Sequence, residues 1–277
     1  MNKKKKILIL SVIILIVLLL ILAFRTDIKA VQYDIQSNKI INDTRIALIT
    51  DLHSCDYGEH QNKLLSIIFN QKPDIILLGG DIVDDKLPQE KAKEFLSAVS
   101  EKYPCFYVSG NHEYWSNDIS GIKKMIEGYG ISILEGDNIS FEINGQNITI
   151  YGIDDPDIGE NEFEKQLKRC ANKINEENLS ILLTHRPERI DSYLPYGFDL
   201  ILSGHAHGGQ WRIPGIMNGL IAPNQGWFPK YAGGIYEFDH TQMIVSRGLA
   251  KESTQVPRIF NRPEVVIINI KPQNNSA

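Results

Sequence analysis

The fold of this chain is decided by the stretch Leu77-Leu78-Gly79-Gly80-Asp81. The apolar run over residues 74–78 predicts a buried strand, which two glycines and a carboxylate end abruptly. In open α/β sheets, ligands bind at the carboxyl edge of the strands, where loops converge and glycine lets a backbone approach closely. Asp81 therefore stands where an α/β protein is expected to carry a ligand-binding side chain.

Four other apolar runs also end in side chains of the kind that bind metal ions. With Asp81, the candidates in chain order are Asp51, His53, Asp81, Asn111, His112, His185, His205 and His207. They include five of the seven histidines of the chain. Because the loops at the carboxyl ends of strands converge, we expect these residues to form one site.

The residue types in this set suit a pair of divalent metal ions. Two cations about 3.5 to 4 Å apart need a bridging carboxylate and several neutral ligands, because two like charges are held close together. Asp81 is the candidate bridge. Asp51 and His53 are two residues apart and can reach one ion from a single loop, and His205 and His207 repeat this spacing. Asn111 can bind through its carbonyl oxygen, which leaves the adjacent His112 uncommitted.

An apolar segment near the N-terminus is the second strong signal. Between residues 7 and 24 only Ser11 is not apolar, and a helix of that length extends about 27 Å, close to the thickness of a bilayer core. The length and the lack of a clear cleavage site favour an uncleaved anchor over a cleaved signal peptide or a buried core helix. Lys3 to Lys6 precede the segment, which favours a cytoplasmic N-terminus and an extracytoplasmic body.

The charge of the body argues against a nucleic-acid partner. Of 29 basic residues, five lie in the first 25 positions, where there is no acid. The remainder holds 24 basic and 34 acidic residues, a net charge of −10. Phosphate backbones are held mainly by Lys and Arg, so no nucleic acid is expected and a nuclease is disfavoured. The three cysteines show no CxxC spacing, and we expect buried thiols, with Cys55 the weaker alternative of an extra ligand.

The periodicity of the chain changes between its two halves. The first half alternates expected strands at 31–35, 45–50, 74–78 and 105–109 with expected helices at 60–70, 89–100 and 118–129. The second half has one expected helix, 160–172, among strands at 131–134, 139–143, 147–152, 179–183, 198–202, 234–238, 243–246 and 265–270. Asn144-Gly145 and His240-Thr241 are expected hairpin turns. The pattern predicts an α/β (α+β) fold, a four-layer α/β/β/α sandwich of two mixed sheets.

In this order, the polar turns resemble the signature of a known family. Asp51-x-His53, Gly80-Asp81, Gly110-Asn111-His112-Glu113, His185 and Gly204-His205-x-His207 are similar to the motifs of calcineurin-like metallophosphoesterases, over residues 45–238. The run Gly204 to Gln210 and Tyr114 after Glu113 resemble more specifically the bacterial YkuE/YaeI-like branch, often membrane-associated. Every signature position is filled, and no role is carried onto Arg186 or Trp211.

The resemblance implies a role for each site residue. One ion would be held by Asp51, His53, Asp81 and His207, and the other by Asp81, Asn111, His185 and His205. A hydroxide that bridges the ions would attack phosphorus, while His112 would protonate or stabilise the leaving oxygen. Ligands of these types accept manganese, iron or zinc.

The leading hypothesis is a membrane-anchored phosphoesterase with two metal ions, acting outside the cytoplasmic membrane on a phosphomonoester, a phosphodiester or a pyrophosphate. A lipid headgroup, a lipid-linked or nucleotide pyrophosphate and a wall-polymer phosphate are open alternatives for the substrate. The rival hypothesis is a non-catalytic metal-binding scaffold of the same fold, and the filled signature favours the enzyme. We expect a cytoplasmic tail and anchor helix over 1–25, a linker and first strand over 26–44, and the metallophosphoesterase domain over 45–271.

Two acidic features have less specific interpretations. Glu113 follows His112 and is expected either to accept a hydrogen bond from it or to lie in solvent. Asp154, Asp155 and Asp157 suggest calcium, but their spacing favours an acidic turn before the helix that begins at Glu160.

Overall fold

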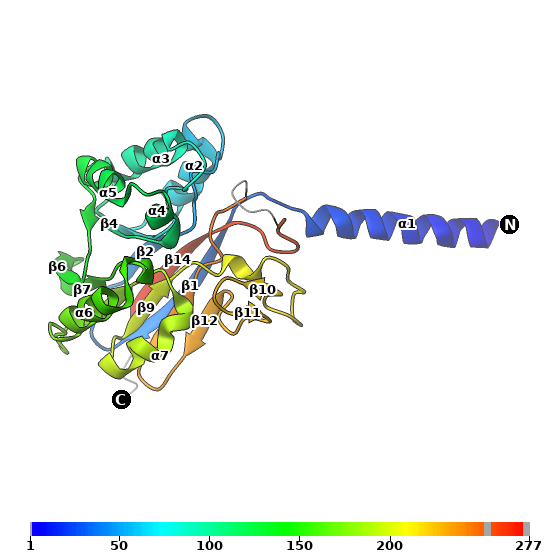
Figure 1. The fold of residues 1–277 in the computed structure, drawn as a ribbon. Coiled ribbons are helices and arrows are strands. Elements are labelled where there is room, and N and C mark those ends of the chain that lie inside the picture. The colour runs from blue at the N-terminus through cyan, green and yellow to red at the C-terminus, as the bar shows by residue number, and fades with distance from the viewer. Residues whose placement is uncertain (1, 252–255, 274–277) are drawn as a thin grey trace.

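The computed structural model describes residues 2–251 and 256–273, and two six-stranded sheets pack face to face within them (Figure 1). The first sheet has the order β1 (Lys29–Ser37), β14 (Glu264–Pro272), β2 (Thr44–Ile49), β3 (Ile75–Gly79), β4 (Cys105–Val108), β5 (Ser132–Ile133). The second has the order β12 (Gly234–Glu237), β13 (Gln242–Val245), β9 (Leu200–Ser203), β8 (Leu179–Leu183), β7 (Gln146–Gly152), β6 (Asp137–Ile143). Both sheets are mixed, since β14 runs antiparallel to β2 and β6 antiparallel to β7.

Helices cover the outer face of each sheet (Figure 1). They are α2 (Asn62–Gln71), α3 (Glu90–Ser100) and α5 (Ile119–Gly128) on the first sheet, and α6 (Glu160–Ala171) and α7 (Ile190–Tyr193) on the second. Strand side chains alternate between cores: Leu77 and Leu183 lie between the sheets, whereas Leu78 and Leu182 pack under the helices. The expected four-layer sandwich of two mixed sheets is confirmed.

Most expected elements are present within a few residues of their predicted bounds. The turn at Asn144-Gly145 joins β6 to β7 with φ of 52° and 78°, as a tight hairpin requires. β1 pairs in parallel with β14 along its whole length and so forms the edge of the first sheet. The division of the chain at residue 45 stays a prediction.

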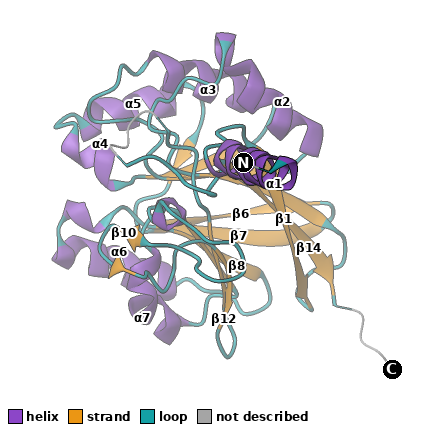
Figure 2. Ribbon diagram, turned by 90° about the vertical axis from the view of Figure 1, so that its right-hand side faces the viewer, coloured by secondary structure: helices purple, strands orange, loops and turns teal. Residues whose placement is uncertain are grey.

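The helix α1 (Lys3–Ala23) stands apart from the body (Figures 1 and 2) and is long and apolar enough to cross a membrane. Its side chains are exposed except at Ala23, so the alternative of a buried core helix is wrong. At the end of α1 the amide of Phe260 donates a hydrogen bond of 2.7 Å to the carbonyl oxygen of Ala23. The helix α1 thus meets the body at its last turn.

Candidate metal centre

The candidate residues lie at the carboxyl ends of five strands. β2, β3 and β4 run parallel in one sheet, and β8 and β9 run parallel in the other. Asp51 and His53 follow β2, and Asp81 follows β3. After β4 the chain forms a short helix that the sequence did not indicate, α4 (Asn111–Trp115), and β9 leads to the turn η5 (His207–Gly209). All eight candidates lie in the connections that follow these five strands, Asn111 and His112 within α4.

The backbone of these connections adopts an unusual conformation. Asp51, His53, Asp81, His205 and His207 all have φ between 47° and 65°, a region that non-glycine residues rarely adopt. Such conformations cost roughly 1 to 3 kcal/mol each and persist only where the surrounding structure imposes them. Gly80 is required for a different reason, because a Cβ there would lie 2.6 Å from Nδ1 of His185.

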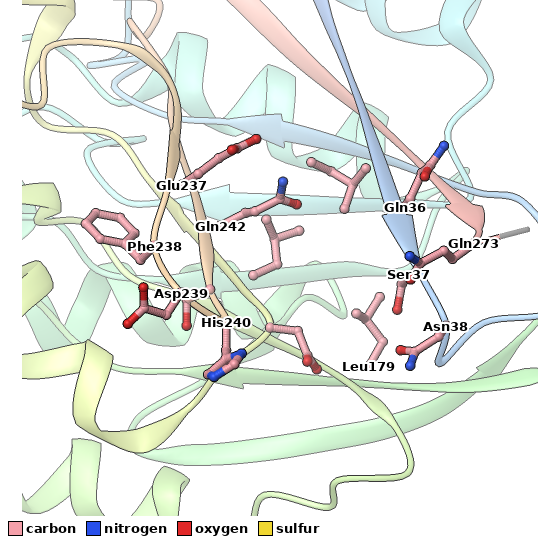
Figure 3. Close-up of a pocket in the computed structure, with 14 residues that line it drawn as sticks. Gln36, Ser37, Asn38, Leu179, Glu237, Phe238, Asp239, His240, Gln242 and Gln273 are labelled. Atoms are coloured by element: carbon pink, nitrogen blue, oxygen red, sulfur yellow. The ribbon is translucent and has the colours of Figure 1, made fainter. Parts of the chain in front are cut away.

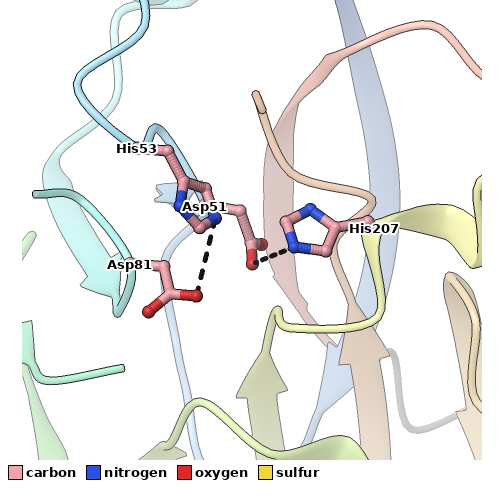
Figure 4. A group of neighbouring side chains, drawn as sticks. All are labelled: Asp51, His53, Asp81 and His207. Carbon is pink, nitrogen blue, oxygen red and sulfur yellow. Dashed lines mark ion pairs between the residues drawn. The ribbon is translucent and has the colours of Figure 1, made fainter. Parts of the chain in front are cut away.

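Two clusters share Asp81. The ligand-type atoms of Asp51, His53, Asp81 and His207 lie within 4.8 Å of one another (Figure 4), and so do those of Asp81, His185 and His205. Oδ2 of Asp81 lies 3.5 Å from Nε2 of His53 and 3.1 Å from Nε2 of His185. One carboxylate oxygen therefore faces both clusters, as a bridging ligand must.

The chemistry of the set fits metal ions. Each of the seven expected ligands has one buried polar atom without a hydrogen-bond partner: Asp51 Oδ2, His53 Nε2, Asp81 Oδ2, Asn111 Oδ1, His185 Nε2, His205 Nδ1 and His207 Nδ1. Leaving a buried polar atom unpaired costs about 1 to 3 kcal/mol, so a concentration of such atoms fits residues that bind a cation. Six of the seven residues lie in the two clusters, and Asn111, at the start of α4, adds another unpaired buried oxygen.

Neighbouring groups fix the orientation of the imidazoles. Nδ1 of His53 lies 2.9 Å from Oδ1 of Asp84, and Nδ1 of His185 lies 2.8 Å from the carbonyl oxygen of Gly79. When an acceptor holds one ring nitrogen, the other nitrogen keeps a lone pair for a cation. The sequence did not indicate a role for Asp84, because Asp84 lies three residues beyond Asp81, the residue at the end of the strand.

Electrostatics separates the histidines into two groups. Burial opposes the charge of His185, but Asp81 beside it raises the pKa of His185 to about 10. Burial and the nearby His185 lower the pKa of His205 well below its usual range, and burial and the nearby His53 do the same for His207. Neutral imidazole is the form that binds metals: His205 and His207 are held in it, whereas a cation that binds His185 would displace its proton.

His112 lies at the edge of the site and is not among the unpaired atoms. Nδ1 of His112 lies 2.7 Å from Oδ1 of Asp85 and 3.2 Å from Oδ1 of Asp84. Burial opposes the charge, but the hydrogen bond that His112 donates to Asp84 raises the pKa of His112 to about 9. The carboxylates that orient His112 are therefore Asp84 and Asp85, and Glu113 is not among them.

Glu113 has a structural role that neither sequence interpretation foresaw. Its side chain is fully buried and accepts hydrogen bonds from the backbone amides of Asp81, Ile82, Val83 and Gly110, at 2.7 to 3.0 Å. These amides belong to the loops that follow β3 and β4. Glu113 thus ties two ligand-bearing loops together.

A second buried network supports His205. Arg186 makes two hydrogen bonds to Asp155, at 2.5 and 2.8 Å, and Nη1 of Arg186 donates to Oδ1 of Asn224 at 2.6 Å. The same oxygen of Asn224 lies 2.8 Å from Nε2 of His205. Asp154 pairs with Lys123 at 2.7 Å. Asp154 and Asp155 are thus committed to basic side chains, as expected of an acidic turn and not of a calcium site.

The hollow in Figure 3 is separate from the metal centre. It lies at the turn between β12 and β13, and its lining includes Ser37, Asp199 and His240 but none of the eight candidate residues. His240 remains a turn residue. Likewise, Cys55 lies outside the clusters of ligand-type side chains in the described part of the chain.

The fold and the paired clusters are those of a metallophosphoesterase. Residues 44–209 match the sequence model of the calcineurin-like phosphoesterases. The chain therefore belongs to the calcineurin-like phosphoesterase family, hydrolases that act on phosphoric esters. The family and the class of enzyme expected from the sequence are thereby confirmed.

Named relatives support this membership. A metallophosphoesterase of Campylobacter jejuni is 30% identical over 258 residues, which cover 88% of this chain and 63% of that protein. The metallophosphoesterase YkuE of Bacillus subtilis is 28% identical over 257 residues, 89% of this chain and 87% of YkuE. The phosphopantetheinyl hydrolase of Mycobacterium tuberculosis has the same fold, with a TM-score of 0.51 at 11% identity over 85% of this chain and 98% of the hydrolase.

Proposed function

We propose that this protein is a membrane-anchored phosphoesterase that works with two divalent metal ions. The observation that carries the proposal is the convergence of six buried, unpaired ligand atoms in two clusters joined by Asp81. Asp51, His53, Asp81 and His207 would hold one ion, and Asp81, Asn111, His185 and His205 the other. Such a pair supplies a water molecule of lowered pKa and neutralises charge on phosphate oxygens.

His112 is the proposed acid of the reaction. Asp84 and Asp85 hold its Nδ1, which leaves Nε2 to donate a proton to the leaving oxygen of the ester. Its backbone amide also donates a hydrogen bond of 2.8 Å to Oδ1 of Asp81. This hydrogen bond fixes the position of His112 relative to Asp81, the proposed bridging ligand.

The anchor is proposed to be α1, with the body outside the cytoplasmic membrane. The support is the length and apolarity of α1, its exposed side chains and the four lysines that precede its apolar part. An envelope phosphoester, such as a lipid headgroup diester, a lipid-linked pyrophosphate or a wall-polymer phosphate, suits a site held there. Manganese, iron and zinc are the candidate ions.

The direct test uses the full chain, purified in detergent. Metal content is measured before and after chelation, and hydrolysis of bis-p-nitrophenyl phosphate and p-nitrophenyl phosphate is measured with manganese, iron or zinc restored. We expect two bound ions for each chain, and turnover that is lost on chelation and regained with metal. Bound metal without hydrolysis of either ester would favour the alternative, a non-catalytic scaffold of the same fold.

A further inference from the structure

One segment after η5 carries an unusual concentration of exposed apolar side chains. We call residues 211–228 the apolar lobe, which includes the short strands β10 (Ile221–Ala222) and β11 (Gly226–Trp227). In the described chain after residue 24, nine large hydrophobic side chains are strongly exposed, and five of them lie in this lobe. Ile216 is 84% exposed, Trp227 67% and Phe228 69%. Exposed apolar patches of this kind mark interaction surfaces.

The charge of the lobe differs from that of the body around it. No acidic residue occurs from Leu200 to Tyr236, although the body as a whole is strongly acidic. The only charged residue of the lobe is Arg212, and Lys230 follows it closely. An apolar surface with weakly basic flanks suits an anionic lipid surface.

Hydrogen bonds connect the lobe to the anchor through residues 259–261. The amide of Arg212 donates to the carbonyl oxygen of Ile259 at 2.9 Å, and the next amide, that of Phe260, donates to Ala23 at the end of α1. Both contacts are between backbone atoms. Because they are made by the neighbouring residues Ile259 and Phe260, they bring the lobe close to the end of the anchor. In Figure 1 the loops around β10 and β11 reach toward the side from which α1 leaves the body.

The same segment connects the lobe to the metal centre. The side-chain amide of Asn261 donates to the carbonyl oxygens of His207, at 2.7 Å, and of Gln210, at 3.1 Å. His207 is an expected ligand, and Gln210 directly precedes the lobe. Hydrogen bonds through residues 259–261 therefore connect the anchor, the lobe and the site at one corner of the molecule.

From these contacts we propose that the apolar lobe docks on the surface of the membrane that α1 crosses, with Trp227, Phe228 and Ile216 in the interfacial layer. Tryptophan is enriched at that depth because its ring is amphipathic. The proposal rests on the proposed anchor, and it adds a second point of attachment that fixes the orientation of the body. The metal centre is then held at the level of the lipid headgroups, and a phosphoester of a membrane lipid is the class of substrate that this placement favours.

Tryptophan fluorescence can test the docking directly, because the three tryptophans are Trp115, Trp211 and Trp227 and α1 contains none. The full chain is reconstituted in vesicles of phosphatidylcholine with a quarter phosphatidylglycerol, with or without bromine on the acyl chains. In a Trp115→Phe variant, which reports only the lobe, we expect bromine to reduce the emission by roughly half. In a variant with Trp211→Phe and Trp227→Phe, which reports only Trp115, we expect little change.

A matched pair of surface variants checks that the lobe is responsible. Phe228→Ser should weaken the quenching of the Trp115→Phe protein, whereas Ile41→Ser, at a side chain equally exposed at 70%, should not. Emission that responds to protein concentration but not to bromine would indicate a second copy on the lobe and would overturn the proposal. Absence of quenching in protein that floats with the vesicles would overturn it as well.

Two measurements distinguish the docking of the lobe from the proposed anchor and the proposed phosphoesterase activity. Loss of flotation with the vesicles would overturn the anchor and the docking together. Hydrolysis of a soluble diester reports the phosphoesterase alone, and it is measured on the wild-type chain in the same vesicles because Trp115 packs against His112, with 4.8 Å between the ring centroids. Quenching without hydrolysis would support the docking and contradict the proposed enzyme.

Discussion

Oδ1 of Asn224 lies 2.8 Å from Nε2 of His205 and also accepts a hydrogen bond from Arg186. A guanidinium group only donates, so Asn224 must present its carbonyl oxygen to Arg186. Nη1 of Arg186 also lies near Nε2 of His205, at 3.1 Å, but the contact with the Asn224 oxygen is the shorter one. We infer from it that Nε2 donates a hydrogen bond to that oxygen, which leaves a lone pair on Nδ1, the buried atom without a partner. Asn224 thus selects the tautomer of His205 that can bind a metal ion.

The first prediction concerns this contact. Asn224→Ala removes the acceptor, and the affinity for one of the two metal ions should fall by about 10- to 100-fold, as is usual for partners of metal-binding histidines. The affinity is measured by titrating metal into protein from which a chelator has removed the ions. Asn224→Asp keeps a carboxyl oxygen in place and is the matched control. Equal affinity in the alanine variant and the wild type would remove Asn224 from this role.

The second prediction separates ligands from the acid. Asp81→Asn and His205→Ala should lower the metal content of the purified protein, because both remove an unpaired buried ligand atom. His112→Ala should keep both ions and lose about 100-fold or more in rate, since a general acid acts only in the transition state. Elemental analysis and turnover are measured on the same samples. Full occupancy with normal turnover in Asp81→Asn would contradict the bridging assignment.

The third prediction is about Glu113 and stability. Glu113→Ala leaves four buried amides without an acceptor, at a cost of about 1 to 3 kcal/mol for each unsatisfied group, so the free energy of unfolding should fall by several kcal/mol. Glu59→Ala, at an exposed side chain, should have little effect. Urea unfolding compares the two variants. A small change in Glu113→Ala would show that water replaces the carboxylate.

The fourth prediction is that α1 is needed for location and not for folding or chemistry. A chain that begins at Thr26 keeps β1 and the ion pair between Asp27 and Arg262, and loses the hydrogen bond from Phe260 to Ala23. It should fold, bind two ions and hydrolyse a soluble diester at nearly the rate of the full chain. On a lipid ester in vesicles it should be slower, because tethering raises the effective concentration at the surface.

The location is checked on cells that carry the full chain. Protease added to intact cells should cut the body, given the lysines before α1. Protection until lysis would place the body in the cytoplasm.

The fifth prediction concerns pH and the buried thiols. Burial raises the pKa of Cys105 and of Cys170 to about 12. Only the thiolate reacts with iodoacetamide, so alkylation of the folded protein should be slow at pH 8 and keep rising through pH 10. In the urea-unfolded chain the rate should level off above a pH of about 8.5 to 9.

The same shift affects stability. As the pH rises, the thiols ionise in the unfolded chain before they ionise in the folded protein, so the free energy of unfolding should fall above that pH. Peptide mapping by mass spectrometry gives the rate at each cysteine, and an early plateau in the folded protein would contradict the shift.

Much of the fold could be read from the sequence because its determinants are local. Apolar runs such as residues 74–78 and the glycines that end them are short-range signals, and the alternation of Leu77 and Leu78 between two cores follows from the strand period of two. The ligand-type residues could be named for the same reason, since each stands directly after such a run. Where the chain departs from these signals, as at the five-residue α4 and the apolar lobe, the sequence indicated no element.

The groups that support the site come from segments that are far apart in the chain and meet only on folding. Asp84 and Asp85 reach His112 from 28 and 27 positions away, and Asn224 reaches His205 across a loop. Glu113 turned out to hold backbone amides, although the sequence places it beside His112. These partners are chosen by how two sheets pack and how their loops converge, and hydrogen bonds between distant segments leave no periodicity in the chain. Strand ends and ligand types are local properties of the chain, whereas packing sets the hydrogen-bond partners of the imidazoles, the place of Asp81 between two clusters and the corner at which α1 meets the body.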